Sequence, residues 1–317
     1  MTRAVVFAYH NVGARCLRVL RAHGIEVALV VTHEDDPAEA HWFARVADVA
    51  GDLELPWITP ADANAPDTVA RVAALAPDFI FSFYYRAMLR APLLALAQRG
   101  ALNMHGSLLP HYRGRAPVNW AVLHGERHTG ATLHYMADKP DAGDIVAQQA
   151  VPILPDDTAK DVFDKVTVAA EICLDDVLPA LLAGTAPRRS NDIARGSYFG
   201  GRKPEDGRID WSQAARAVHN LVRAVAPPYP GAFTTIAGHP ARVLRTRIVA
   251  ADGVPAPPAL TVEGGALLAR CGSGGLLRID ALEIDGRVHP PAMVVARFGA
   301  APLPLPEGPG QPAPSRP

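Results

Sequence analysis

The chain has 317 residues, 49% of them hydrophobic and 20% charged, which suits one large domain or two ordinary ones with a sizeable core. The formal net charge of −1 provides no positive field for nucleic acid or an anionic membrane, so we expect neither as a partner. Three well-separated cysteines, no signal peptide and no stretch near the roughly 18 apolar residues of a membrane span together predict a cytoplasmic protein without disulfides.

The first 150 residues alternate strand-like and helix-like segments. The strand-like runs are mostly apolar, as expected for parallel strands that are covered on both faces. They are Ala4–Ala8, Ile25–Thr32, Pro56–Ile58, Asp78–Phe83 and Ala101–Met104. The helix-like segments between them are Arg15–His23, Glu39–Ala50, Asp67–Ala76 and Ala87–Gln98. This rhythm predicts an α/β, Rossmann-like fold with a mostly parallel sheet and flanking helices.

The next segments predict a hairpin and a long helix. Thr129–Met136 and Asp144–Ile153 have β propensity and can pair around the turn between them. Thr158–Ala183 reads as a helix, with Thr158 as its N-cap.

The pattern changes near residue 190, which predicts a second domain. From Gly231 to about Val295 the segments are short, rich in β-formers and broken by glycines, which is typical of a small antiparallel barrel. We therefore predict a catalytic domain (1–190), a linker (191–205) and a small OB-like β-barrel domain (206–300). The proline-rich residues 301–317 are expected to be disordered.

Two nucleotide-binding fingerprints are missing. The turn after the first strand, Tyr9–Gly13, has one glycine, so it lacks the GxGxxG of dinucleotide-binding folds. The chain also has no GxxxxGK[ST] loop. These absences disfavour a dehydrogenase and a phosphate-loop ATPase.

The densest run of reactive side chains is residues 103–119, directly after a predicted strand. Ligands of open α/β sheets bind beyond the carboxyl ends of the strands, so this run is the first candidate site. Asn103 and His105 are two apart, so in an extended segment both point to one side. His105 can move protons near neutral pH, and Asn103 can donate an amide N–H to an oxyanion. Arg113 and Arg115 suit a carboxylate or a phosphate.

A second polar cluster, residues 138–144, could supply a carboxylate that holds the His105 ring. Asp141 is the candidate because Gly143 permits a tight turn just beyond it. The structural alternatives stay open at this point. A histidine after a strand is often a structural residue, and Asp-Ala-Gly-Asp is by itself an ordinary turn.

Two motifs together resemble the signature of the 10-formyltetrahydrofolate-dependent formyltransferases. The first is Asn103–Pro110 followed by Tyr112–Pro117, and the second is Asp141–Ile145. The resemblance implies a Rossmann-like domain followed by an OB-like barrel. It implies 10-formyltetrahydrofolate as co-substrate, and no metal ion is expected.

The resemblance also implies roles for individual residues. His105 corresponds to the general acid/base, Asn103 to the residue that stabilises the tetrahedral intermediate, and Asp141 to the carboxylate that keeps the histidine charged and oriented. The segments that correspond to the formyl-folate site comprise eight residues: Ala87, Met88, Leu89, Arg115, Ala137, Asp138, Lys139 and Pro140.

Within this family, further stretches are similar to the branch that formylates UDP-4-amino-4-deoxy-L-arabinose in lipid A modification and polymyxin resistance. They are Val5–His10, Phe81–Arg86, Gly106–Trp120 and Val222–Phe233. The resemblance implies a nucleotide-linked amino sugar as the acceptor. Bifunctional members of that branch carry an additional oxidative decarboxylase domain, for which this chain has no residues left.

Three other functions remain open from the sequence. One is a methionyl-tRNA formyltransferase, although residues 201–317 carry 13 basic and 9 acidic side chains, a mild surplus for a tRNA-binding domain. Another is a non-catalytic folate- or nucleotide-binding module, and the last is a hydrolase that releases formate. The sequence does not determine the identity of the sugar or the oligomeric state.

Overall fold

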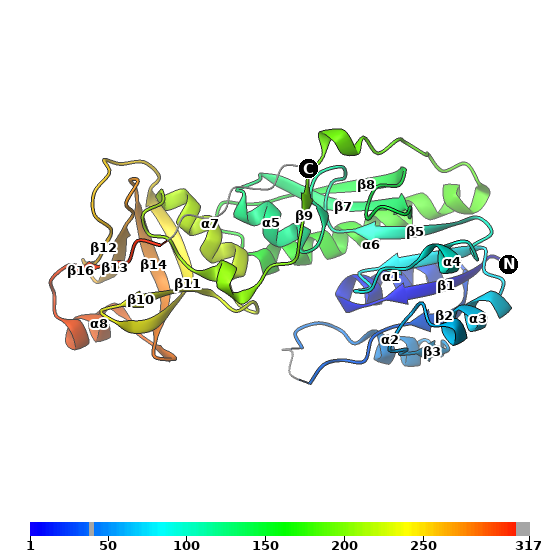
Figure 1. Ribbon diagram of the computed structural model, residues 1–317, viewed down its shortest axis with the longest axis horizontal. Helices are drawn as coiled ribbons and strands as arrows, with labels where there is room; N and C mark the ends of the chain where they lie inside the picture. The colour runs from blue at the N-terminus through cyan, green and yellow to red at the C-terminus, as the bar shows by residue number, and fades with distance from the viewer. Residues whose placement is uncertain (38–40, 309–317) are drawn as a thin grey trace.

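The computed structural model describes residues 1–37 and 41–308 of the chain. Two large sheets lie towards opposite ends of an elongated molecule (Figure 1). Helix α7 (Ala215–Val225) contacts both the first domain, through α5 (Pro117–Leu123), and strand β11 (His239–Ala250) of the second sheet. The predicted fold class is therefore confirmed: a mostly parallel, Rossmann-like sheet with flanking helices precedes a smaller antiparallel domain.

The first sheet has the strand order β3-β2-β1-β4-β5-β7-β8. The five strands at one side are parallel, whereas β7 runs antiparallel to both β5 and β8. The strand bounds are β1 Arg3–Ala8, β2 Glu26–Val31, β3 Trp57–Ile58, β4 Phe79–Phe83, β5 Gly100–His105, β7 His128–Tyr135 and β8 Ile145–Pro152. The predicted hairpin of β7 and β8 is confirmed.

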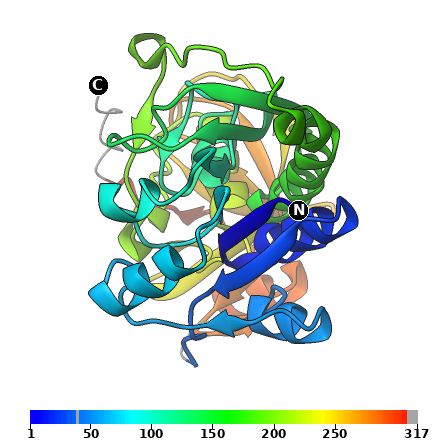
Figure 2. The ribbon, with the colours of Figure 1, turned by 90° about the vertical axis from the view of Figure 1, so that its right-hand side faces the viewer.

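Helices cover both faces of this sheet, which explains why its central strands are apolar on both sides. Figure 2 shows the two layers, with α1 and α6 on one side and α3 and α4 on the other. The helix bounds are α1 His10–Ala22, α2 Val46–Asp52, α3 Pro66–Ala74, α4 Ala91–Leu94 and α6 Ala159–Ala183. Alternate residues of β1 enter the two cores, with Val6 facing one and Phe7 the other. Thr158 caps α6 through a capping box with Asp161, as predicted.

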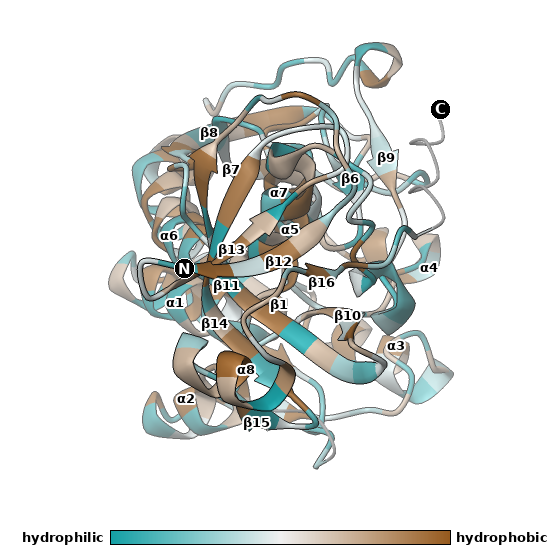
Figure 3. Ribbon diagram, turned by 90° about the vertical axis from the view of Figure 1, so that its left-hand side faces the viewer, coloured by the Kyte–Doolittle hydropathy of each residue, from teal (hydrophilic) through white to brown (hydrophobic). Residues whose placement is uncertain are grey.

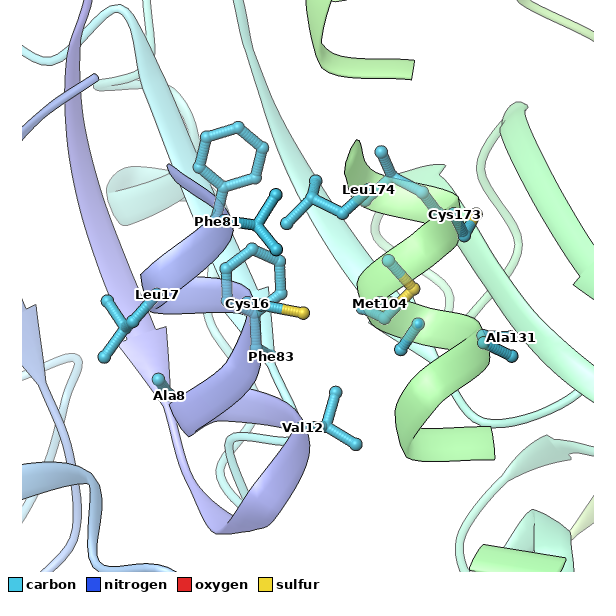
Figure 4. Packing of buried hydrophobic residues seen from close by; sticks show 14 of the residues in the cluster. Ala8, Val12, Cys16, Leu17, Phe81, Phe83, Met104, Ala131, Cys173 and Leu174 are labelled. Carbon is cyan, nitrogen blue, oxygen red and sulfur yellow. The ribbon is translucent and has the colours of Figure 1, made fainter. Parts of the chain in front are cut away.

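The larger core lies where α1 and α6 meet the central strands. Figure 4 shows Cys16 and Leu17 of α1 and Leu174 of α6 beside the aromatic rings of β4. Phe81 is fully buried, and its ring stacks on that of Phe83 with centroids 5.5 Å apart.

Replacing Phe81 by alanine should lower the free energy of unfolding by about 3–5 kcal/mol, because a large cavity opens in a close-packed core. Urea unfolding followed by circular dichroism measures this loss. Phe81→Leu should cost clearly less. Equal stability of Phe81→Ala and the parent chain would contradict this account of the core.

Two predicted helices are shorter than expected. The helix predicted over Ala87–Gln98 is reduced to α4, because the Asn64 side chain binds the preceding loop through the Met88 carbonyl and the Arg90 N–H, at 2.9 and 2.8 Å. The helix predicted over Glu39–Ala50 begins at Val46, and residues 39 and 40 lie outside the described residues. Helix α1, by contrast, begins five residues before the predicted Arg15.

The second sheet is antiparallel, with the path β10-β11-β14-β13-β12-β16 and β15 paired to β14. Figure 3 views this end of the molecule, where α8 lies beside the curled sheet. The remaining bounds are β10 Ala232–Ile236, β12 Ala259–Glu263, β13 Ala266–Arg270, β14 Leu276–Ile284, β15 Arg287–Val288, α8 Pro291–Phe298 and β16 Leu303–Pro304. The fully buried Trp211 packs into the core of this sheet.

The tail has a defined place as far as residue 308. Strand β16 pairs with β12, and Leu305 is buried against the second core. The disordered tail predicted from residue 301 therefore does not start there, since this pairing orders its first residues. Residues 309–317 lie outside the described residues. No helix in the described part of the chain is long and apolar enough to cross a membrane.

Candidate active site

The candidate residues meet on one face of the first sheet. Asn103 and His105 are two residues apart on β5, so both side chains project from the same face of the sheet. Both reach Oδ1 of Asp141, which lies 3.4 Å from Asn103 Nδ2 and 3.5 Å from His105 Nδ1. The expectation that these three side chains converge is confirmed.

Asp141 reaches this face because the loop between β7 and β8 folds back onto the sheet. Its backbone has φ 50°, a left-handed conformation that costs energy for a residue other than glycine. Gly143 approaches the chain closely, and a Cβ there would lie 2.0 Å from the Tyr135 carbonyl oxygen. Glycine is therefore needed at position 143 because of this close contact with β7.

The Asp141 carboxylate is largely buried but surrounded by donors and positive charge. Burial by itself raises its pKa, but His105, the hydrogen bond and charge of His134, and the Gly114 N–H outweigh this effect and lower the pKa below its ordinary value. The Gly114 N–H donates to Oδ2 at 2.9 Å. Asp141 is therefore ionised at neutral pH and holds the site together.

Asp141→Asn should lower the free energy of unfolding by about 1–3 kcal/mol near pH 7, because hydrogen bonds to a charged acceptor are lost. A carboxylate whose pKa is lowered on folding stabilises the native state above the unfolded value of 3.8, and this contribution disappears as the pH falls through the folded value. Urea unfolding at pH 7 and at about pH 3 should therefore show the difference between parent and variant shrinking in acid. A difference that is the same at both pH values would contradict the lowered pKa.

The His105 ring is held at both nitrogens. Nε2–H donates to the Tyr112 carbonyl oxygen at 2.8 Å, and Nδ1 faces Asp141. The ring is buried, with 6% of the residue exposed. These two contacts fix the orientation of the ring.

A second histidine belongs to the cluster and was missed from the sequence. His134 on β7 pairs directly opposite Asn103 on β5 and is buried. Its Nδ1–H donates to the Tyr135 carbonyl, and Nε2 lies 3.1 Å from Asn103 Nδ2 and 3.5 Å from Asp141 Oδ1. The only signal in the sequence was a polar residue inside an apolar strand-like run.

The loop after β5 packs closely against Tyr84 at Gly106. A Cβ at Gly106 would lie 1.9 Å from the Tyr84 hydroxyl oxygen, so only glycine fits this contact. Within residues 1–37 and 41–308, the buried Tyr84 hydroxyl has no hydrogen-bond partner.

The residues predicted for the formyl-folate site lie in loops beside β5. Ala87, Met88 and Leu89 follow β4, and residues 137–140 lie in the loop between β7 and β8. Strands β4 and β7 are the two neighbours of β5 in the sheet. Leu89 is buried and Pro140 is half-buried. The others are exposed: Ala87, Met88, Arg115, Ala137, Asp138 and Lys139. Among the described residues, no cluster of His, Cys, Asp and Glu could hold a metal ion.

The chain thus combines an α/β fold with a largely buried cluster of an amide, an imidazole and a carboxylate. The chain belongs to the formyltransferase family, because the family model "Formyl transferase" matches residues 2–178 and the model "Formyl transferase, C-terminal domain" matches residues 202–295.

Solved structures share this fold at low sequence identity. The N-formyltransferase from Helicobacter canadensis, in a complex with folinic acid and dTDP-3-aminofucose, is 17% identical over 88% of this chain and 99% of its own, with a TM-score of 0.67. The sugar 3N-formyltransferase WlaRD, with dTDP and 5-N-formyl-THF, is 17% identical over 90% and 99%, with a TM-score of 0.69. HypX from Aquifex aeolicus is 20% identical and matches 95% of this chain but 48% of its own, with a TM-score of 0.61.

Proposed function

We propose that this enzyme transfers the formyl group of 10-formyltetrahydrofolate to the 4-amino group of a nucleotide-linked amino sugar in the cytoplasm. The observation that carries the proposal is the convergence of an amide, an imidazole and a carboxylate within 3.5 Å on one face of β5. Formyl transfer to an amine needs an oxyanion donor and a group that moves a proton, and these residues supply both.

In the proposed reaction, the neutral amine attacks the formyl carbon and a C–N bond forms. Asn103 Nδ2 stabilises the oxyanion, replacing its long contact of 3.4 Å to Asp141 with a shorter hydrogen bond to the substrate. The bond from the formyl carbon to N10 of the folate then breaks. His105 conveys the proton lost by the amine to N10 through Nδ1, which lies 3.5 Å from Asp141, while the Tyr112 carbonyl keeps its bond to Nε2 and Asp141 orients the ring.

The proposed folate site lies between the loop after β4 and the loop between β7 and β8. Residues 87–89 and 137–140 would border the pteridine through backbone and shape, since several of their side chains point to solvent. The structures from Helicobacter canadensis and of WlaRD, which share the fold, were solved with formyl-folates, which supports this choice of co-substrate.

The proposed acceptor is UDP-4-amino-4-deoxy-L-arabinose, in lipid A modification and polymyxin resistance. The stretches Val5–His10 and Phe81–Arg86 resemble the branch of the family that uses this sugar. The neighbour solved with dTDP-3-aminofucose supports the wider class of nucleotide-linked amino sugars.

An assay of formyl transfer tests both levels of the proposal. The enzyme is incubated with 10-formyltetrahydrofolate and, in separate reactions, UDP-4-amino-4-deoxy-L-arabinose, dTDP-3-aminofucose or charged initiator tRNA, and products are detected by mass spectrometry. Formylation of the UDP sugar is expected. Faster turnover of the dTDP sugar would change the proposed acceptor to another nucleotide-linked amino sugar. Formate release that needs no amine would indicate a hydrolase, and folate binding without turnover would indicate a binding module.

Charged initiator tRNA is disfavoured as the acceptor by the charges of the second domain. Several arginines there pair with carboxylates, which neutralises charge that a tRNA-binding surface would use. These ion pairs are Arg242 with Glu283, Arg247 and Arg278 with Asp280, and Arg297 with Asp285. Formylation of the tRNA in the assay would overturn this interpretation.

A further inference from the structure

Residues 188–199, which the sequence analysis assigned largely to a linker, pack along the catalytic domain. The predicted linker from residue 191 begins with a buried side chain, since Asn191 is only 7% exposed. The segment ends in β9 (Tyr198–Phe199), which pairs in parallel with β6 (Arg113–Gly114). It contacts the loop that carries Asp141 and the loop that follows His105.

At its beginning, the 188–199 segment holds the loop of Asp141. Asn191 Nδ2 donates to the carbonyl oxygens of Asp141 and Gly143, at 3.0 and 3.2 Å. Backbone hydrogen bonds of 2.7 and 2.9 Å join Arg189 and Ile145 just after this loop. The Asn191 side chain thus binds the turn at two points, Asp141 and Gly143.

At its end, the same segment holds the loop that follows His105. The N–H groups of Arg113 and Arg115 donate to the carbonyls of Ser197 and Phe199, at 3.0 and 2.9 Å. The Tyr112 N–H donates to Ser197 Oγ at 2.8 Å. Tyr112 is also the residue whose carbonyl accepts from His105 Nε2.

The two loops meet at the Asp141 carboxylate. Gly114, in the strand paired with β9, donates its N–H to Asp141 Oδ2, while Oδ1 faces His105 and Asn103. The position of this carboxylate relative to the ring therefore depends on two loops, and the 188–199 segment binds both of them. Small displacements of catalytic groups are costly, because about 1 Å can reduce the rate roughly a hundredfold.

We propose that Asn191 is a positioning residue for formyl transfer. Its side chain keeps the Asp141 turn in place next to His105, while Ser197 holds the loop that follows His105. Asn191 contacts no reacting atom in this proposal. Its amide acts through the backbone of Asp141, and its effect on catalysis therefore requires the Asp141 carboxylate. The kinetic test of this inference rests on the proposed function, because it measures kcat for formyl transfer.

The first test is a double-mutant cycle with Asn191→Ala and Asp141→Ala in the full chain. Asn191→Ala should reduce kcat roughly 10- to 100-fold in the parent chain, and less than about twofold in the Asp141→Ala chain. The exposed neighbour substitution Asp192→Asn is the matched control and should leave kcat unchanged. An equal loss in both backgrounds, or no loss in the parent, would overturn the proposal, because either result separates Asn191 from Asp141.

A second measurement does not depend on activity. Hydrogen exchange of the Gly114 amide reports whether Asp141 Oδ2 still accepts its hydrogen bond. Asn191→Ala should accelerate this exchange, whereas Asp192→Asn should not. Unchanged exchange would overturn the inference even if every acceptor failed in the formyl-transfer assay, so its failure is distinguishable from failure of the proposed function.

Variants of Ser197 provide an independent test if Asn191→Ala does not fold. Ser197→Ala should lower kcat roughly 2- to 10-fold, the equivalent of one neutral hydrogen bond, and accelerate exchange of the Tyr112 amide. Ser197→Thr keeps the hydroxyl and should restore both. An unaltered exchange rate and kcat in Ser197→Ala, or equal losses in the alanine and threonine variants, would contradict the role of the 188–199 segment.

Discussion

Replacing His105 by alanine should lower kcat for formyl transfer by about 10²–10⁴-fold, the usual contribution of a positioned acid/base. The imidazole is buried and held between the Tyr112 carbonyl and Asp141, so solvent cannot easily take over its proton transfer. Steady-state kinetics with 10-formyltetrahydrofolate and the amino-sugar nucleotide measure the loss. Because binding is separate from proton transfer, KM for the acceptor should change much less than kcat.

A matched control for this prediction is available in the same sheet. His128 is the first residue of β7 and is exposed, so His128→Ala should retain normal turnover. Circular dichroism and thermal unfolding establish that His105→Ala is folded. Near-normal kcat in a folded His105→Ala variant would remove His105 from the proposed mechanism.

Replacing Asn103 by alanine should lower kcat by about 10²–10³-fold, the loss typical for one oxyanion donor. Asn103 Nδ2 already lies among the catalytic groups, 3.1 Å from His134 and 3.4 Å from Asp141. The acceptor-dependent rate, measured by mass spectrometry of the formylated product, checks this expectation.

Asn103→Ala also removes a partner of His134, so its stability has to be measured with its kinetics. Gln98→Ala serves as the control, since it deletes an exposed side-chain amide outside the cluster and should leave kcat unchanged. If Asn103→Ala lost stability but kept kcat, the residue would be structural, and the oxyanion would need another donor.

Local periodicity was enough to predict the part of the site on β5. Asn103 and His105 are two residues apart in a strand, and alternation alone puts them on one face. The strand itself was predictable because apolar runs alternate with helix-like segments. Asp141 was found through its motif, and its contact with His105 then followed from the fold of the loop.

Strand register explains why His134 was missed. It lies opposite Asn103 only because β7 runs antiparallel to β5 in one register, and a slip of one residue would turn it to the other face. The sequence analysis predicted the pairing of β7 with β8 and did not address its pairing with β5. A buried histidine in an apolar run therefore had no visible partner.

Tertiary contacts also overrode local propensity. The alanine- and leucine-rich stretch 87–98 favours a helix, but the Asn64 side chain binds the loop before α4 and shortens it. Residues 188–199 have the composition of a linker, yet they bind both the Asp141 loop and the loop that follows His105. The single strand pair of β9 and β6 is too short to leave a periodic signal.

By itself, the sequence determined the family, the two-domain fold and the three residues expected to carry the chemistry, because these depend on local periodicity and on motifs whose residues are close together. Only the tertiary structure decided that Asp141 touches His105, that His134 completes the cluster and that Asn191 holds the Asp141 turn. Those contacts join segments far apart in the chain. They depend on strand register, loop closure and burial, which no short window of sequence encodes.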